Sequence, residues 1–220
     1  MLPQNCLLCD AHAGKELLCA ACRNDLPHHN GPSCPVCAHP SPQQAICGAC
    51  LKNPPAFDAT HAAFIYDFPL DALLKHLKYG GNLVLVDFFA QALLEHLSAH
   101  PPDWLIPMPL HPQRLKHRGF NQSLEIARSL SRLSGIPLLA ESVSRTRHSE
   151  PQAGLPLAKR AANVRGIFAV SGDLKGKSIL LVDDIMTSGA SLNELAKTLK
   201  KAGAIRVECL VAARTLPHHV

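Results

Sequence analysis

The chain has 220 residues, of which 47% are hydrophobic, and its formal net charge is +5. This length allows one α/β domain with a small appendage, and the hydrophobic fraction is sufficient for a buried core. No run of about 18 apolar residues occurs, and the N-terminal MLPQNCLLCD lacks both a basic flank and an apolar stretch. We therefore expect no membrane span and no signal peptide, and a cytoplasmic location.

The N-terminal quarter is dominated by cysteines in C-x-x-C pairs. Nine residues separate the first pair from the second, and nine separate the third from the fourth, so the motif C-x2-C-x9-C-x2-C occurs twice. The eight residues are Cys6, Cys9, Cys19, Cys22, Cys34, Cys37, Cys47 and Cys50. Four thiolates are the ligand set of a tetrahedral structural zinc site, so we expect two Zn²⁺ ions per chain. A cytosolic location favours metal over disulfides, and the competing interpretations are an iron–sulfur cluster or redox dithiols.

The spacing leaves the pairing of these cysteines open. Sequential pairing, first with second and third with fourth, is the simplest arrangement, and an interleaved cross-brace is the alternative. This short N-terminal module has too few large apolar side chains to form a core. Metal binding would therefore supply its folding free energy. We expect a Cys-rich zinc-ribbon module over residues 1–54 and a second domain over 55–220, joined by the Pro-containing segment KNPPAFD. The remaining cysteine, Cys209, lies in an apolar strand pattern and is expected to be a buried core thiol.

The middle of the chain alternates apolar strand patterns with helical periodicity. Strands are expected over residues 60–68, 104–109 and 136–139, and helices over 70–79, 83–96 and 121–133. The segment between the second strand and the third helix is expected to be a basic loop, with Arg114, Lys116, His117 and Arg118 just before Gly119. Such a loop at a strand end suits a phosphate group, and a solvent-facing basic turn is the simpler alternative.

Basic residues are concentrated between positions 111 and 165. This segment contains ten Lys or Arg and three acidic residues, an excess of +7, whereas the whole chain carries +5. A polyanionic partner is therefore indicated, either pyrophosphate, nucleic acid or both. Residues 142–162, which include Arg145 and Arg147, lack apolar periodicity, and we expect a long lid or binding loop.

The segment Lys177–Ala202 predicts a strand, a loop and a helix in that order. The strand 178–182 is followed by Asp183 and Asp184, and small residues occupy Thr187–Ser191 before helical spacing begins. Small residues at a helix N-terminus allow an anion to approach the backbone N–H groups, and carboxylates suit sugar hydroxyls or hydrated Mg²⁺. The pattern thus indicates a ribose 5-phosphate site, although two acidic residues can also simply end a strand.

The stretch VDDIMTSGAS resembles the phosphoribosyl pyrophosphate (PRPP) motif of type I phosphoribosyltransferases. The resemblance implies that Asp183 and Asp184 hold the ribose hydroxyls and are the catalytic carboxylates, with Mg²⁺ bound alongside PRPP. It also implies a 5-phosphate site formed by Thr187, Ser188, Gly189, Ala190 and Ser191. Serine occupies positions 188 and 191, where threonine is commoner, and the hydroxyl group is retained at both.

Further motifs resemble the ComF family. They are LKYGG at 77–81, PMPLH at 107–111, RGFNQ at 118–122 and the spaced QAGL…RAANVRGIF at 152–168, behind the double cysteine module. The resemblance implies a type I phosphoribosyltransferase-like α/β fold, with a mostly parallel sheet flanked by helices, preceded by a small zinc-ribbon module. It further implies a competence-associated protein that handles single-stranded DNA during DNA uptake.

Two functions follow from these motifs. In the first, the chain binds PRPP and Mg²⁺ and possesses transferase activity, with Arg114, Arg118 and Arg147 neutralising the pyrophosphate. In the second, it is a nucleic-acid-binding or helicase-binding zinc adaptor with a non-catalytic phosphoribosyl site. Single-stranded DNA and a competence helicase are the expected macromolecular partners. The sequence leaves the acceptor, the oligomeric state and turnover itself open.

Overall fold

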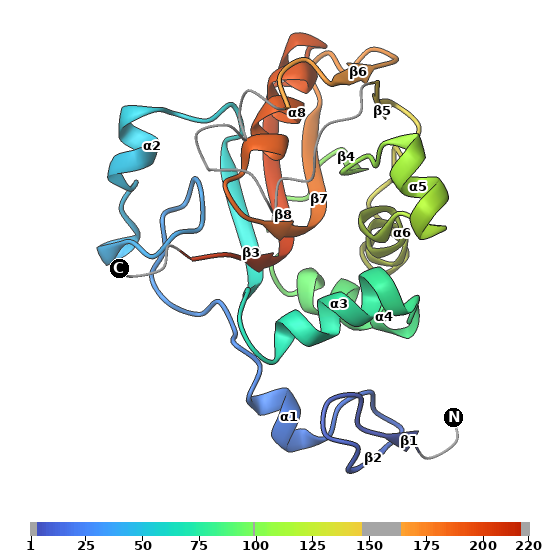
Figure 1. Ribbon diagram of the computed structural model, residues 1–220. Helices are drawn as coiled ribbons and strands as arrows, with labels where there is room; N and C mark the ends of the chain where they lie inside the picture. Colours follow the sequence, from blue (N-terminus) through green and yellow to red (C-terminus); the bar gives the residue numbers. More distant parts are fainter. Residues whose placement is uncertain (1–3, 99, 147–163, 217–220) are drawn as a thin grey trace.

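The computed structural model describes residues 4–98, 100–146 and 164–216 (Figure 1). Its centre is a four-stranded parallel sheet with the strand order β3-β8-β7-β4. The strands are β3 (Ala59–Ile65), β8 (Arg206–Arg214), β7 (Ser178–Met186) and β4 (Trp104–Pro107). Because all four run in one direction, their carboxyl ends lie at the same edge of the sheet, where open parallel sheets bind ligands.

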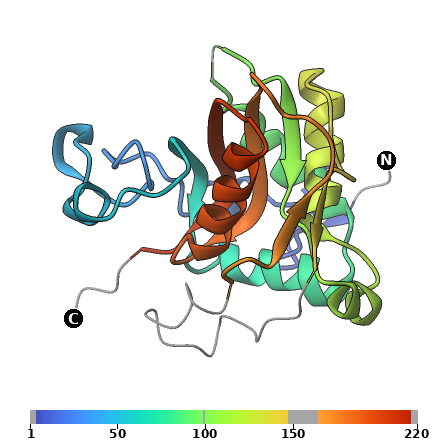
Figure 2. The ribbon, with the colours of Figure 1, turned by 90° about the horizontal axis from the view of Figure 1, so that it is seen from above.

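Helices cover both faces of the sheet (Figures 1 and 2). One face packs against α8 (Ala190–Lys201), and the other packs against α3 (Leu70–Gly80), α4 (Val84–Leu94) and α6 (Gln122–Ser134). Alternate β7 side chains enter the two cores, Leu180 on the α4/α6 side and Leu181 on the α8 side. The continuous apolar run of β7 is explained by this two-sided burial. The expected parallel sheet flanked by helices is confirmed.

Both edges of the sheet are covered by irregular chain. Along β3, the segment between the two cysteine repeats forms backbone hydrogen bonds, including Ile65 N to Pro27 O at 2.7 Å and His29 N to Ala63 O at 3.0 Å. Beside β4, the strand expected over 136–139 is reduced to a single parallel bridge between Leu105 and Leu138. Covering the edges in this way satisfies exposed backbone groups and prevents pairing with other chains.

Two local expectations differ from the structure. The segment expected as a basic loop forms helix α5 (Pro112–Arg118): Pro112 occupies its first turn, His111 Nδ1 accepts a hydrogen bond from Gln113 N, and Gly119 ends it with φ of +84°. Strand β7 also continues past the two aspartates, because it pairs with β8 as far as Met186 opposite Arg214. The carboxylates therefore lie on the strand and not after it.

The long polar segment is described only at its ends. There, β5 (Val143–Arg145) and β6 (Phe168–Val170) form a two-stranded antiparallel ribbon. The intervening residues 147–163, with Arg147 and most of the expected lid, lie outside the described residues.

The cysteine repeats form short elements that pack against the domain at two places. They comprise β1 (Gln4–Asn5), β2 (His12–Gly14), α1 (Ala20–Asn24), the 3-10 helix η1 (Pro42–Gln44) and α2 (Gly48–Lys52). The first repeat lies below α3 and α4 in Figure 1 and contributes Leu18 and Leu26 to the same core cluster as Phe64. The second repeat lies beside β3. The boundary at residues 54 and 55 stays a prediction.

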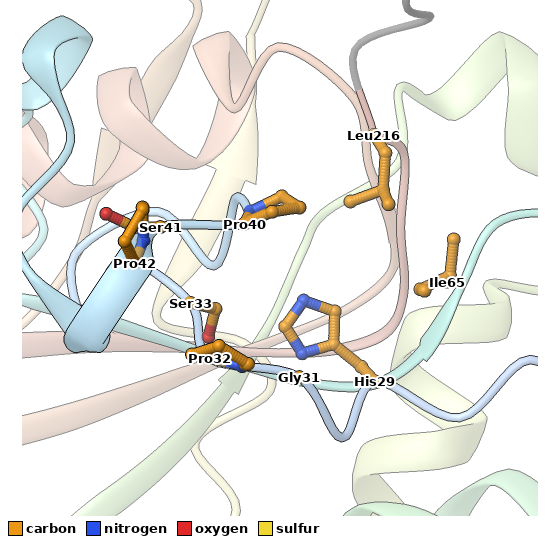
Figure 3. A pocket seen from close by; sticks show the side chains of 9 residues that line it. All are labelled: His29, Gly31, Pro32, Ser33, Pro40, Ser41, Pro42, Ile65 and Leu216. Atoms are coloured by element: carbon orange, nitrogen blue, oxygen red, sulfur yellow. The ribbon is translucent and has the colours of Figure 1, made fainter.

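A cavity of about 340 Å³ lies where the second repeat, β3 and the residues after β8 meet (Figure 3). Ile65 and Leu216 line it from the domain, and the rest of its wall comes from residues 29–42. His29 lies within this wall, with its Nε2 2.8 Å from Ala38 O. None of the helices in the described ranges is both long and apolar enough to cross a lipid bilayer.

Candidate functional site

The eight paired cysteines form two four-sulfur clusters. Cys6, Cys9, Cys19 and Cys22 make one cluster and Cys34, Cys37, Cys47 and Cys50 the other, and within each cluster all ligand atoms lie within 4.8 Å of one another. Such proximity suits a tetrahedral Zn²⁺ site. The clusters combine neighbouring pairs, so the sequential pairing is found and the interleaved alternative is not. Cys209, by contrast, is fully buried in the core, as expected.

A second candidate site is a cavity of about 460 Å³ at the carboxyl end of β7. Its wall is built from six elements, α3, α5, α6, β5, β7 and the first turn of α8. Its charged lining comprises Lys75, Lys78, Arg114, Arg118, Arg145, Asp183 and Asp184. Cationic side chains thus outnumber carboxylates around it, and the cavity favours an anion that also carries hydroxyl groups or a metal ion.

The two aspartates are held by different partners. Ser123 Oγ donates to Asp183 Oδ1 at 2.8 Å, and Lys78 Nζ lies 2.6 Å from Asp184 Oδ2. Burial and the adjacent Asp184 carboxylate raise the pKa of Asp183 to about 7, against a weaker opposite effect of Ser123 and Lys78. A second positive charge or a hydroxyl donor would therefore favour the ionised pair.

Ser123 is placed against Asp183 by the cap of helix α6. Asn121 Oδ1 accepts hydrogen bonds from Ser123 N and Leu124 N, while Asn121 Nδ2 donates to Met108 O at 3.1 Å. The first hydrogen bonds start the helix, and the last ties it to the segment that follows β4. The RGFNQ motif thus contributes the residue that fixes the orientation of the α6 N-terminus.

Three arginines form the cationic wall. Burial lowers the pKa of Arg145 to about 10, with a further contribution from the charge of Arg114, and Asp183 acts in the opposite direction. The pKa of Arg114 is also lowered by burial and by the charge of Arg118. Arg118 donates to Gln122 Oε1 at 2.6 Å and lies 5.5 Å from the centre of the Tyr79 ring. The mutual repulsion of these cations would be relieved by a bound polyanion.

The loop after β7 approaches the cavity from the other side. Thr187 and Ser191 line it, while the exposed Ser188, together with Gly189 and Ala190, forms the turn into α8. Gly189 has φ of +74°, and a Cβ atom there would lie 2.6 Å from Met186 Cε. The positive φ therefore favours glycine, and a larger residue would also require the terminal methyl group of Met186 to move. The positive end of the α8 dipole lies at this turn.

Known proteins resemble the chain along most of its length. Residues 1–51 match the double zinc ribbon domain, and residues 120–216 match the phosphoribosyl transferase domain. "DNA utilization protein YhgH" of Escherichia coli (strain K12) is 31% identical over 191 residues, covering 83% of this chain and 84% of that protein. "Competence protein F" of Haemophilus influenzae is 29% identical over 225 residues, covering 95% and 96%. The chain belongs to the ComF family.

The ComF chain consists of two parts, the cysteine repeats and the parallel-sheet domain. The structure combines a Cys-rich double zinc ribbon with a type I phosphoribosyltransferase-like sheet, as expected. Among solved structures, the purine phosphoribosyltransferase from Pyrococcus horikoshii aligns with 26% identity and a TM-score of 0.39, covering 60% of this chain and 73% of that one.

Several lining residues of this ComF chain were not predicted from the sequence. Lys78 and Tyr79 lie within the LKYGG motif, and Ser123 directly follows RGFNQ, so the motifs did point to the right segments. Helical periodicity over residues 70–79 shows only which side of the helix is polar. The contact of Lys78 with Asp184 depends on how α3 packs beside β7, which periodicity alone does not give.

Proposed function

We propose that this ComF-family chain binds PRPP with Mg²⁺ in the cavity at the end of β7. The observation that carries the proposal is the combination, in one cavity of about 460 Å³, of a carboxylate pair and a cationic wall. PRPP has matching chemistry, because its ribose hydroxyls donate to carboxylates while its phosphate groups need cations and N–H donors. Neither a purely anionic nor a purely cationic site would suit both parts.

Different residues of the cavity would bind different groups of PRPP. Asp183 and Asp184 would accept hydrogen bonds from the ribose hydroxyls, and the turn over 187–191 would hold the 5-phosphate at the N-terminus of α8. Arg114 and Arg118 would hold the pyrophosphate, together with Arg147, which lies outside the described residues. Lys78 would keep the Asp184 carboxylate correctly oriented through their ion pair.

The carboxylate pair also fits Mg²⁺. Hard carboxylate oxygens are its preferred protein ligands, and a bound cation would reduce the repulsion from Asp184 that, after burial, raises the pKa of Asp183. When bound, Mg²⁺ would offset charge on the pyrophosphate oxygens. The chain's own contribution is to fix the ribose between the aspartates and the α8 turn, so that C1 is held in one position.

In a transfer reaction, the C1–O bond to pyrophosphate breaks and its electron pair leaves with the pyrophosphate. The acceptor's lone pair forms the new bond to C1, and the proton it loses passes to solvent. Arg114 and Arg118 would stabilise the leaving pyrophosphate, and the aspartates would stabilise the positive charge on the ribose, hence their assignment as catalytic residues. The identity of the acceptor stays open.

The test is calorimetric titration of PRPP and Mg²⁺ into zinc-loaded protein and into Asp183→Asn/Asp184→Asn. We expect the wild type to bind and the double variant to lose binding by at least about a hundredfold, since two charge-assisted contacts are removed. Asp25→Asn/Asp173→Asn removes the same charge at exposed positions outside the cavity and should bind like the wild type. Equal binding by both double variants, or none by a folded wild type, would refute the proposal.

We also propose that the chain handles single-stranded DNA in DNA uptake. The supporting observation is Tyr79, a cavity-lining residue that is 77% exposed and lies under the guanidinium of Arg118. Lys116 and His117 lie on the same short helix as Arg118. Exposed aromatic rings beside arginines are typical of sites where unpaired bases stack. Fluorescence anisotropy of a labelled oligonucleotide should show affinity that falls steeply with salt. Undetectable or salt-independent binding would contradict this role.

Two further assignments belong to the same proposal. A cytoplasmic location would place the two four-cysteine clusters in a reducing environment, where thiolates remain available to zinc. A competence helicase is the proposed protein partner, reached through the zinc ribbons. In the alternative, the chain is a nucleic-acid-binding or helicase-binding zinc adaptor, and its phosphoribosyl site binds without turnover. PRPP binding without release of pyrophosphate across nucleobase and DNA acceptors would favour that alternative.

A further inference from the structure

The last residue of β8 is a buried arginine that connects two otherwise separate parts of the chain. Arg214 is 1% exposed. Its Nε donates to Cys37 O at 2.8 Å, within the second four-cysteine cluster. Its Nη1 donates to Met186 O at 2.8 Å and also to Thr187 O, where the turn over residues 187–191 begins. One guanidinium therefore holds the backbone of a cluster loop and of the turn after β7.

The positive charge of Arg214 needs a counter-charge, because an isolated buried charge is strongly destabilising. Among the described residues, no carboxylate forms an ion pair with it. The hydrogen bond from its Nε to Cys37 O places the guanidinium beside the second four-cysteine cluster. Four thiolates around one Zn²⁺ leave about two negative charges on the centre. The second zinc centre can therefore supply the compensation that no Asp or Glu in the described ranges provides.

We propose that Arg214 is a positioning residue that couples zinc occupancy of the Cys34–Cys50 centre to the conformation of the turn over residues 187–191. With zinc bound, the anionic centre holds the guanidinium in place, and the guanidinium holds the Met186 and Thr187 carbonyls. Without zinc, the charge loses its partner, and its hydrogen bonds to the turn weaken. The second zinc centre would thus act on the ligand site, in addition to folding its own ribbon.

The first cluster serves as an internal control. Its Cys6 packs into the core cluster on the α3/α4 side of the sheet, whereas Arg214 is hydrogen-bonded to Cys37 O and to the turn after β7. Within the described part of the chain, the hydrogen bonds of Arg214 reach none of the four cysteines of the first cluster. Loss of zinc from the first centre should therefore leave the turn unchanged.

The test combines hydrogen–deuterium exchange of residues 185–191 with zinc release to a chromogenic chelator, measured on the full chain without PRPP. We expect Cys37→Ser/Cys50→Ser to lose one zinc and to accelerate exchange in the turn by about tenfold or more, because buried hydrogen bonds to the turn are lost. Cys9→Ser/Cys22→Ser should also lose one zinc, yet exchange in the turn should match the wild type. Equal acceleration by both pairs, or by neither, would overturn the proposal.

Substitutions at Arg214 separate charge from geometry. Arg214→Gln should release zinc from one centre about tenfold faster and loosen the turn. Arg214→Lys keeps the charge without the planar fork, so it should retain zinc nearly as the wild type does while the turn still exchanges faster. If Arg214→Gln fails to fold, the two cysteine pairs still decide the question.

The consequence for ligand binding rests on the proposed function. If PRPP binds, Cys37→Ser/Cys50→Ser should weaken it by about tenfold, and the first-centre pair should not. If the wild type does not bind PRPP, the proposed function is refuted. The hydrogen–deuterium exchange experiment, which is carried out without PRPP, still tests the role of Arg214.

Discussion

The ion pair between Lys78 and Asp184 allows a sharp test of how the acidic pair is stabilised. The side chains are 17% and 6% exposed, and the two charged atoms lie 2.6 Å apart. Lys78→Met keeps most of the aliphatic stem and removes the charge. Two adjacent carboxyl groups then remain in the wall of the cavity without the cation that the structure pairs with Asp184.

The magnitude lies between those of an exposed and a fully buried pair. Breaking a fully buried pair costs about 3–5 kcal/mol, and the residual exposure of Lys78 reduces this, so we expect about 2–3 kcal/mol at neutral pH. For a chain of this size that corresponds to a fall in Tm of about 5–10 °C.

The loss should also depend on pH. The pKa of Asp183 is raised from 3.8 to about 7, so the folded state binds this proton more tightly than the unfolded state, and stability falls as pH rises across that range. Lys78 opposes the rise in the pKa of Asp183. Without Lys78 the pKa rises further, and the decline continues above about pH 7. The stability difference between wild type and Lys78→Met should therefore grow from about pH 6 to about pH 8.

Urea denaturation at several pH values measures this difference directly. Lys75→Met is the matched control, since Lys75 lies three residues earlier on α3, is 61% exposed and pairs with Asp71 on the same helix. It should change stability little and without the same pH trend. A Lys78→Met variant that is as stable as Lys75→Met, or whose deficit is constant from about pH 6 to 8, would refute the reasoning.

Four other outcomes are expected. Gly189→Ala should weaken PRPP binding measured by calorimetry, and it should lower the free energy of unfolding measured in urea by about 1–2 kcal/mol. The reason is that φ is positive at this position and the new Cβ atom would meet Met186 Cε. Unchanged binding and unchanged stability would contradict this. Elemental analysis should find two zinc ions per chain, and strong chelation should unfold both ribbons by circular dichroism; one zinc or none would contradict the double site. Tyr79→Leu should reduce oligonucleotide affinity by about tenfold while leaving PRPP binding within about twofold, since stacking is lost; equal loss of both would argue against a stacking role. PRPP affinity should rise by up to about tenfold for each unit of increasing pH below about pH 7 and level off above it, because the Asp183 carboxyl ionises over that range. An affinity that falls as pH increases toward 7 would contradict the role of this carboxylate.

Sequence reasoning was most successful where a local pattern determines the structure. The C-x2-C-x9-C-x2-C repeats predicted two four-thiolate sites, and the structure forms one within each repeat, which is the simpler of the two pairings that the spacing left open. The apolar run before Asp183 predicted a buried strand, and burial on both faces explains why that run does not alternate. In both cases the relevant neighbours are close in sequence or belong to a repeating pattern.

It was less successful where packing between distant segments decides. Helix α5 was expected as a basic loop between a strand and a helix, yet Pro112 and Gly119 define both of its ends. The partners of the acidic pair, Lys78 and Ser123, come from helices that lie far from it in the sequence. The sequence pattern of each helix predicts which of its sides is buried, but it does not predict which strand that helix will contact. Residue 147, predicted as a pyrophosphate ligand, stays a prediction.

The zinc ribbons are structural parts of the sheet domain as well as candidate partner sites. The chain between them, around Pro27 and His29, forms backbone hydrogen bonds with β3, so it completes an edge that would otherwise be exposed. The first ribbon adds Leu18 and Leu26 to the core on one side, and the second reaches the turn after β7 through Arg214 on the other. A zinc module that served only to bind a partner protein would not require these contacts with the sheet domain. The arrangement therefore favours zinc ribbons that stabilise the sheet domain, and it gives the second zinc centre a direct connection to the turn after β7.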